Sequence, residues 1–154
     1  TTRLKLLTNI IVLPYRNPFL LAKAIASLDV LSDGRFILAT AAGYLRAEYQ
    51  ALGVDFAKRG KIMEEQVVLM RKLWTQEVVN YQGEFHRVTA AGINPLPVQR
   101  PIPLWFGGQS KVVLRRTGRL ADGWFPYYPW FSAPQLEEDL AVIHDAARKA
   151  GLEF

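Results

Sequence analysis

The most chemically suggestive residues of the sequence are two consecutive glycines, Gly107 and Gly108, followed by Gln109, Ser110 and Lys111. They come directly after a short apolar run that is typical of a buried strand, and Ser110 can cap a helix that begins just beyond it. Glycines let the backbone approach a ligand, and the start of a helix offers free N–H groups and the positive end of a dipole. A phosphate monoester would suit this arrangement. On the local pattern alone, a tight strand-to-helix turn explains the same residues.

A second strand end carries small residues. Ala42 and Gly43 follow another apolar run, and their small side chains would leave room for a flat ring or a phosphate tail. Close packing of a helix on a strand explains them equally well. Tyr44, Tyr49 and Trp124 could stack on an aromatic ligand, although aromatic side chains in such folds lie more often in the core.

The sequence contains no recognisable set of catalytic side chains. It has no Cys, which excludes disulfides and thiolate chemistry, and we expect no metal site because only two histidines occur. We interpret His86 and His144 as surface or partly buried residues. Asp29 is interpreted as structural, either pairing with Arg35 or holding the turn before it. The charged residues around Glu65 are expected to form a solvated helix face.

Composition favours one globular domain. Half of the 154 residues are apolar, which is enough for a sizeable core. The net charge of +5 is spread along the chain rather than gathered in a stripe, so nucleic acid is not an expected partner. No apolar run could span a membrane, and we expect a cytoplasmic protein.

Hydrophobic patterning predicts alternating strands and helices. Each strand is a short apolar run, expected at 4–13, 35–42, 103–106 and 123–127. The first of these runs is nearly continuous, which predicts a strand buried on both faces. Each helix has one apolar face, expected between Asn17 and Gly34 and at 61–74, 110–120 and 132–151. Residues 78–88 alternate around Gln82-Gly83 and predict a β-hairpin, taken as an insertion at 76–92.

Four strand–helix units indicate an α/β fold with a parallel sheet. A TIM (β/α)8 barrel needs roughly 250 residues, so the chain would hold about half of one; a small doubly wound sheet is the alternative. In either case ligands bind where the strands end. This rule selects the loops at 13–17, 41–47, 107–111 and 126–131.

Several segments, in the right order along the chain, resemble the bacterial luciferase-like monooxygenase family. They are Ser27–Arg35, Ala51–Val54, Arg59–Gly60, Leu73–Trp74, Tyr81–Phe85, Asn94–Pro101, Trp105–Gly108 and Ala121–Trp124. The resemblance implies a single partial (β/α) barrel domain over residues 1–154. It also implies an oxidoreductase that uses FMN or the deazaflavin coenzyme F-420 and acts on a small organic substrate.

The resemblance also assigns cofactor-binding residues. Those expected beside the flavin ring are Thr8 and Asn9, those on a second flank are Ala42 and Gly43, and those at the phosphate are Gly107, Gly108, Gln109 and Ser110. No catalytic acid or base is assigned, and Tyr44 stands where some deazaflavin enzymes carry Glu.

Members of the family have further strand–helix units on both sides of the matched region. A half-barrel would expose strand edges, so we expect two copies to associate as a homodimer. The alternative function is a catalytically inactive barrel fragment that serves as a scaffold or self-assembling module.

Overall fold

The computed structural model of the protein describes residues 2–127 and 132–154. The chain divides into two compact units, residues 1–102 and 103–154, and each is described by itself. Both combine parallel strands with helices, which confirms the predicted α/β class. No helix within the described residues is both long enough and apolar enough to cross a membrane.

The sheet of the first unit is built on β3 (Phe36–Ala41). Two short strands, β1 (Leu6–Leu7) and β2 (Ile11–Val12), pair with it in parallel, one after the other. The single strand expected at 4–13 is therefore interrupted, and a cis peptide bond joins Asn9 to Ile10 within the interruption. A 3-10 turn, η1 (Leu13–Tyr15), follows β2.

Burial of the first strand on both faces is a wrong prediction for this chain. Leu4, Leu6 and Leu7 are exposed to 64%, 43% and 38%. The apolar run predicted burial because leucine side chains favour contact with other apolar groups. Within the described part of its unit, however, β1 pairs with β3 alone, so these leucines stay exposed.

Helix α1 (Pro18–Leu31) begins where the sequence predicts. The Asn17 side chain accepts hydrogen bonds from the backbone N–H groups of Phe19 (2.9 Å) and Leu20 (3.2 Å), which caps the helix. Pro18 occupies the first turn, where its missing N–H costs nothing. The helix ends at Leu31, and the turn that follows it includes Gly34, whose φ of +68° lies in the left-handed region that glycine adopts easily.

Asp29 is structural, as expected, but its partner is Gln99 rather than Arg35. The carboxylate is fully buried and accepts from the backbone N–H (2.8 Å) and the side-chain Nε2 (2.6 Å) of Gln99. Arg35 instead donates to the backbone oxygens of Ser32 and Leu4. Asp29 therefore fastens the extended connector of residues 93–102 to the end of α1.

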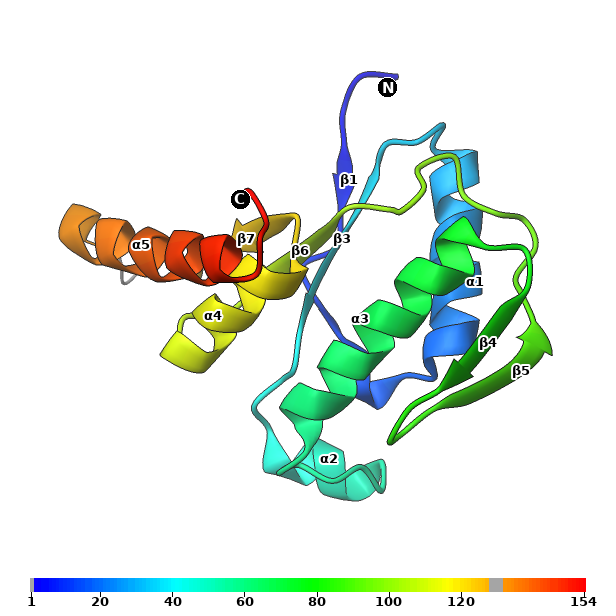
Figure 1. The fold of residues 1–154 in the computed structure, drawn as a ribbon, viewed down its shortest axis with the longest axis horizontal. Coiled ribbons are helices and arrows are strands. Elements are labelled where there is room, and N and C mark those ends of the chain that lie inside the picture. The colour runs from blue at the N-terminus through cyan, green and yellow to red at the C-terminus, as the bar shows by residue number, and fades with distance from the viewer. Residues whose placement is uncertain (1, 128–131) are drawn as a thin grey trace. The chain divides into compact units, whose positions relative to one another are not determined.

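Helix α3 (Arg59–Thr75) packs on α1 and buries the predicted apolar side, as seen for Met63, Val67 and Met70. Figure 1 shows α1 and α3 side by side. Trp74 is fully buried and donates from Nε1 to the Ala22 oxygen at 3.1 Å, which joins the two helices. The segment before α3 was expected to be irregular throughout. It contains a further short helix, α2 (Arg46–Ala51).

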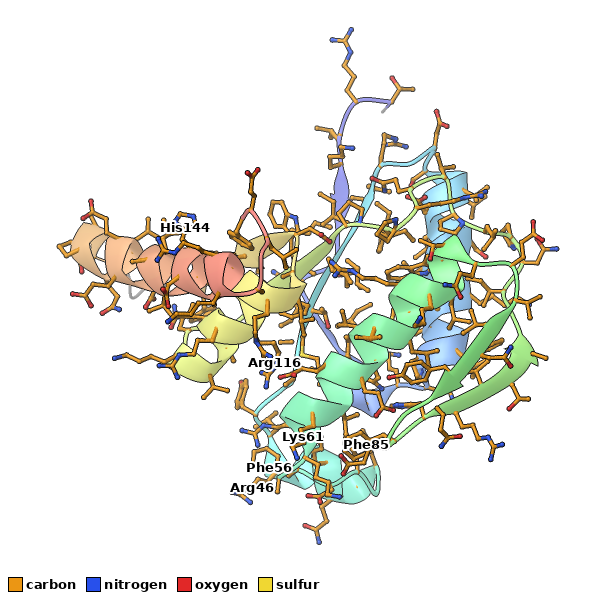
Figure 2. All side chains as sticks on the ribbon, viewed as in Figure 1. Arg46, Phe56, Lys61, Phe85, Arg116 and His144 are labelled. Carbon is orange, nitrogen blue, oxygen red and sulfur yellow. The ribbon has the colours of Figure 1, made fainter. Side chains whose placement is uncertain are left out.

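Around α2, Phe56 is held between two arginines. The guanidinium carbons of Arg46 and Arg59 lie 4.3 Å and 3.8 Å from the Phe56 ring centroid, and Figure 2 shows Arg46 and Phe56 together at this end of the unit. Such cation–π contacts stabilise the loop between α2 and α3.

The expected hairpin is present as β4 (Val79–Gln82) and β5 (Arg87–Ala91), paired antiparallel. Its turn spans residues 83–86, which makes it wider than a turn at Gln82-Gly83 would be. The turn closes with a hydrogen bond from the Gly83 N–H to the His86 oxygen at 2.9 Å.

The second unit contains two parallel strands, β6 (Leu104–Gly107) and β7 (Gly123–Phe125), and two helices, α4 (Lys111–Leu120) and α5 (Ala133–Lys149). Figure 1 shows α4 and α5 packed together. They approach closely at Gly118, where an added Cβ would meet Ile143, Ala146 and Ala147 of α5. The Ser132 side chain caps the start of α5. Ser132 accepts from the Gln135 N–H at 3.4 Å, but the Gln135 side chain donates onward to Asp139.

Candidate functional site

The loop between β6 and α4 exposes bare backbone. Gly108 has a φ of +118°, a conformation that residues with a side chain rarely adopt, and an added Cβ would lie 3.2 Å from Val113. Ser110 caps α4 by accepting from the Val113 N–H at a long 3.4 Å. The first N–H groups of a helix have no partner within it, so this loop presents donors to a ligand.

Side chains of the second unit fix the position of this loop. Trp124 donates from Nε1 to the Gly108 oxygen, and Gln109 donates from Nε2 to the Tyr127 oxygen, both at 2.9 Å. The indole nitrogen of Trp124 and the amide of Gln109 are therefore occupied by the fold itself. Residues 128–131 of the fourth expected loop lie outside the described residues.

In the first unit, Thr8 and Asn9 lie at the interruption between β1 and β2. The Thr8 hydroxyl accepts from the Ala39 N–H (2.9 Å) and donates to the Ala39 oxygen (2.8 Å), so it replaces the backbone pairing that is lost there. Thr40 donates in the same way to the Ile11 oxygen at 2.7 Å. The Thr8 side chain thus holds the strand end in place.

Ala42 and Gly43 lie at the end of β3 beside two tyrosines. Tyr49 is buried and donates to the Ala42 oxygen, so Tyr49 belongs to the core and is not free to stack on a ligand. Gly43 has a φ of +73°, and a Cβ there would lie 2.8 Å from Val12 and 3.3 Å from the Tyr15 hydroxyl. Only glycine fits this position.

The Tyr15 hydroxyl is a group that the sequence did not single out. It is buried next to Gly43 and has no hydrogen-bond partner within the described residues. Burial and then the neighbouring Glu48 carboxylate, which does not reach hydrogen-bond geometry, raise the pKa of Tyr15 to about 12. The phenol therefore remains protonated and able to donate. The available signal was its place in the loop at 13–17, which follows the first expected strand.

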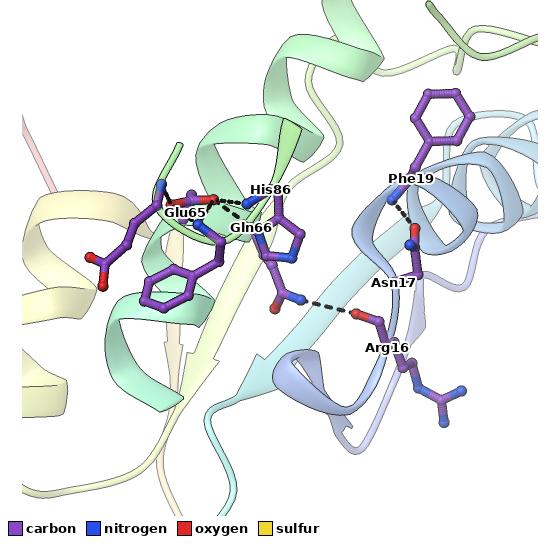
Figure 3. Close-up of polar contacts among 8 residues, drawn as sticks. Arg16, Asn17, Phe19, Glu65, Gln66 and His86 are labelled. Atoms are coloured by element: carbon purple, nitrogen blue, oxygen red, sulfur yellow. Dashed lines mark hydrogen bonds and ion pairs between the residues drawn. The ribbon is translucent and has the colours of Figure 1, made fainter. Parts of the chain in front are cut away.

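Glu65 does not belong to a solvated face, which corrects the expectation for this helix. Its carboxylate accepts from the backbone N–H groups of Glu84 (2.7 Å), Phe85 (3.0 Å) and His86 (2.6 Å), and lies 2.9 Å from the His86 Nδ1. Burial raises the pKa of Glu65, but these hydrogen bonds together outweigh it and lower the pKa overall. Glu65 is the anchor of the hairpin turn (Figure 3).

His144, the other histidine, lies exposed on α5 near Phe154, with ring centroids 6.2 Å apart (Figure 2). No group of three His, Asp or Glu side chains within the described residues is placed to hold a metal ion. The expected cofactor residues fall in both units: Thr8, Asn9, Ala42 and Gly43 in the first, and Gly107, Gly108, Gln109 and Ser110 in the second.

Parallel strands followed by helices define an α/β protein, a class in which ligands generally bind at the carboxyl ends of the strands. The model of the luciferase-like monooxygenase family matches residues 1–154, and the chain belongs to this family. Its fold is part of the TIM barrel of luciferase-like enzymes, which confirms the predicted fold class.

Three similar proteins illustrate the relationship. The F420-dependent glucose-6-phosphate dehydrogenase of Segniliparus rotundus is 34% identical over 156 residues, covering 98% of this chain and 46% of its own length. The monooxygenase RslO1 from Streptomyces bottropensis aligns with a TM-score of 0.86 at 26% identity over 100% of this chain and 47% of its own. An F420-dependent secondary alcohol dehydrogenase, solved with an F420-acetone adduct, aligns with a TM-score of 0.83 at 24% identity, covering 97% and 46%. The chain therefore spans about half the length of these relatives.

Proposed function

We propose that this chain carries the cofactor-binding part of a flavin- or deazaflavin-dependent oxidoreductase that acts on a small organic substrate. When bound, the cofactor supplies the redox chemistry by accepting or donating a hydride. The residues of the chain bind it and shape its surroundings. We propose coenzyme F-420 ahead of FMN, because three relatives that are 30% to 34% identical to this chain are named as F420-dependent enzymes.

The observation that carries the proposal is the loop from Gly107 to Ser110. In this loop, Gly108 has a backbone conformation that residues with a side chain rarely adopt, and the loop leads into the start of the ten-residue helix α4. Backbone N–H groups at such a start bind phosphate oxygens, and the helix dipole adds to the attraction. Lys111 adds a positive charge at the first helical position. These features fit the phosphate that FMN and coenzyme F-420 share.

In the first unit we propose contacts from Asn9, Ala42 and Gly43, as the family resemblance implies. Gly43 supports this role because it has no Cβ, and its backbone at the end of β3 therefore lies close against Val12 and the Tyr15 hydroxyl. Thr8 would act indirectly, since its hydroxyl is already bound to Ala39. We add Tyr15 as a donor to a ligand lying over Gly43.

The test is a fluorescence titration of the purified protein with coenzyme F-420 and, separately, with FMN. Gly108→Val should weaken binding by at least about tenfold, because it blocks the backbone approach and strains the loop. Gly151→Ala is the matched control. That glycine also has a positive φ, +71°, but stands in open space after α5, so affinity should not change.

Equal affinities of the Gly108 variant and the unchanged chain would contradict the loop assignment. If the unchanged chain binds neither cofactor, the proposal that this part of the enzyme binds the cofactor by itself is wrong. The scaffold alternative would then gain support.

A further inference from the structure

A pocket of about 290 Å³ lies in the second unit between α4 and α5. It is lined by three residues from each helix, namely Val112, Arg115 and Arg119 from α4, and Asp145, Ala146 and Lys149 from α5. None of these six is an expected cofactor residue. The pocket is called the basic pocket below.

Positive charge is concentrated at the basic pocket, although the second unit as a whole has none in excess. Residues 103–154 contain equal numbers of cationic (Lys and Arg) and acidic (Asp and Glu) side chains. The described lining of the pocket nevertheless has three cationic side chains and one carboxylate. Helix α4 itself, with the sequence KVVLRRTGRL, has four cationic residues and no acidic one. The pocket therefore attracts anions through charge that its own helix does not neutralise.

Arg115 and Arg119 form the charged wall of the pocket on α4. They are four residues apart, so they lie on the same face of the helix, where two like charges repel each other. Both are exposed, which leaves their guanidinium groups in water, where a dissolved anion can reach them. Arg115 makes no ion pair within residues 2–127 and 132–154. An anion bound at this wall would relieve the repulsion.

Helix α5 adds a third cation, Lys149, and the carboxylate of Asp145. Asp145 accepts from the Lys149 Nζ at 2.7 Å and from the Arg148 guanidinium at 3.0 Å, and these two hydrogen bonds lower the pKa of Asp145. The Lys149 and Arg148 side chains are 75% and 79% exposed, and ion pairs of such exposed groups contribute little. Lys149 is therefore weakly held and can turn to a second anion in the pocket.

The size of the pocket and its apolar lining limit what it can hold. Val112 is 62% exposed although it is apolar, and it lines the pocket together with the buried Ala146. A volume of about 290 Å³ is near the lower limit of small-molecule sites, so the ligand has few carbon atoms. Arg115 and Arg119 are separated along the helix by about 6 Å, which a short aliphatic chain between two anionic groups can span.

We propose that the basic pocket binds a small organic dianion, in which a short aliphatic chain joins a carboxylate to a second carboxylate or to a phosphate-like group. Arg115 and Arg119 bind the two anionic groups, because guanidinium binds carboxylate and phosphate alike through paired N–H donors. Lys149 adds a third positive charge, and Val112 contacts the chain. This site goes beyond the proposed cofactor loop and does not depend on it.

The test compares three acids that share one carboxylate and three CH2 groups, and that end in a methyl, a carboxylate or a phosphonate: pentanoate, glutarate and 4-phosphonobutanoate. Each is titrated into the full chain without any cofactor, and the backbone amides are followed in two-dimensional proton–nitrogen NMR spectra. Both dianions should bind saturably and at least about 5-fold more tightly than pentanoate. The amides that shift should be those of residues 112–119 and 145–149. The tighter of the two dianions identifies the second group of the ligand.

Three variants test the assigned contacts. Arg115→Gln should weaken both dianions by about 3- to 5-fold. Arg87→Gln, which removes the same charge at an exposed position of β5, is the matched control and should leave their affinities unchanged. Asp145→Asn should instead tighten binding by about 2- to 5-fold, because it removes the carboxylate that competes for Lys149.

Equal affinities for pentanoate and the dianions, or equal losses in the Arg115 and Arg87 variants, would overturn the proposal, since attraction by net charge alone would then explain the binding. Shifts confined to residues 107–111 would place the anion at the cofactor loop and would also overturn it. So would the absence of saturable shifts at millimolar concentration. Because the amides report where the anion binds, failure of the basic pocket is distinguishable from failure of the proposed function.

Discussion

Replacing Gly118 with Ala should change the stability of the folded chain through two opposing physical effects. In an exposed helix this change adds about 1 kcal/mol of stability, because Ala is the better helix former. In α4, however, the added Cβ would overlap the Ile143 oxygen and lie 3.0 Å from both the Ala146 Cβ and the Ala147 nitrogen. Two of these three neighbours are backbone atoms of α5, which cannot rotate away.

Overpacking of this kind costs about 1–3 kcal/mol, and rigid backbone neighbours place it near the upper end. After subtracting the gain of about 1 kcal/mol, the variant should lose about 1–2 kcal/mol of unfolding free energy. The loss would arise because α4 and α5 move apart at Ile143 and Ala147, which are buried between them.

Urea unfolding of the full chain, followed by far-UV circular dichroism, measures this change through the shift of the midpoint at constant slope. Arg115→Ala, at an exposed position of the same helix, is the control and should stay within about 0.5 kcal/mol of the unchanged protein. If Gly118→Ala is as stable as the unchanged chain or more so, the close crossing of α4 and α5 is refuted.

Three further outcomes are expected. Asp29→Asn should lower the unfolding free energy in urea by about 2–3 kcal/mol, because one of the two N–H donors of Gln99 would then face the side-chain N–H of Asn instead of an oxygen. The same change at the exposed Asp33 should be neutral, and equal effects of the two changes would contradict the structural role of Asp29. Because the fold lowers the pKa of Glu65, the ionised carboxylate stabilises the folded chain fully above its ordinary pKa of 4.5, and this stabilisation is lost as the pH falls through the folded-state pKa. The difference in unfolding free energy between the unchanged chain and Glu65→Gln should therefore narrow below pH 4.5. A difference that stays constant with pH would refute this. Trp124→Phe should weaken cofactor binding about 3- to 10-fold through loss of its bond to Gly108, measured by the same titration, and unchanged binding would show that the loop holds its shape without it.

The sequence predicted best those features that depend on neighbouring residues. Asn17 and Pro18 mark the start of α1 because capping involves atoms only two or three residues away. The alternation of strands and helices, and hence the fold class, follows from hydrophobic periodicity in the same local way.

Features that depend on contacts between residues far apart in the chain could not be predicted from the sequence. The partner of Asp29 lies 70 residues along the chain, and the donors to Glu65 lie 19 to 21 residues away. Nothing in an apolar run shows that it will be broken at Asn9. The burial of the Tyr15 hydroxyl is likewise a consequence of the assembled unit.

The support of the hairpin by Glu65 bears on how such a barrel could be engineered. The turn takes its shape from four contacts to one carboxylate on α3 rather than from the strand sequences alone. A graft of residues 76–92 into another scaffold would therefore need an acidic residue at the matching helical position. Without that residue, the transplanted loop would lose its conformation even if every grafted residue were kept.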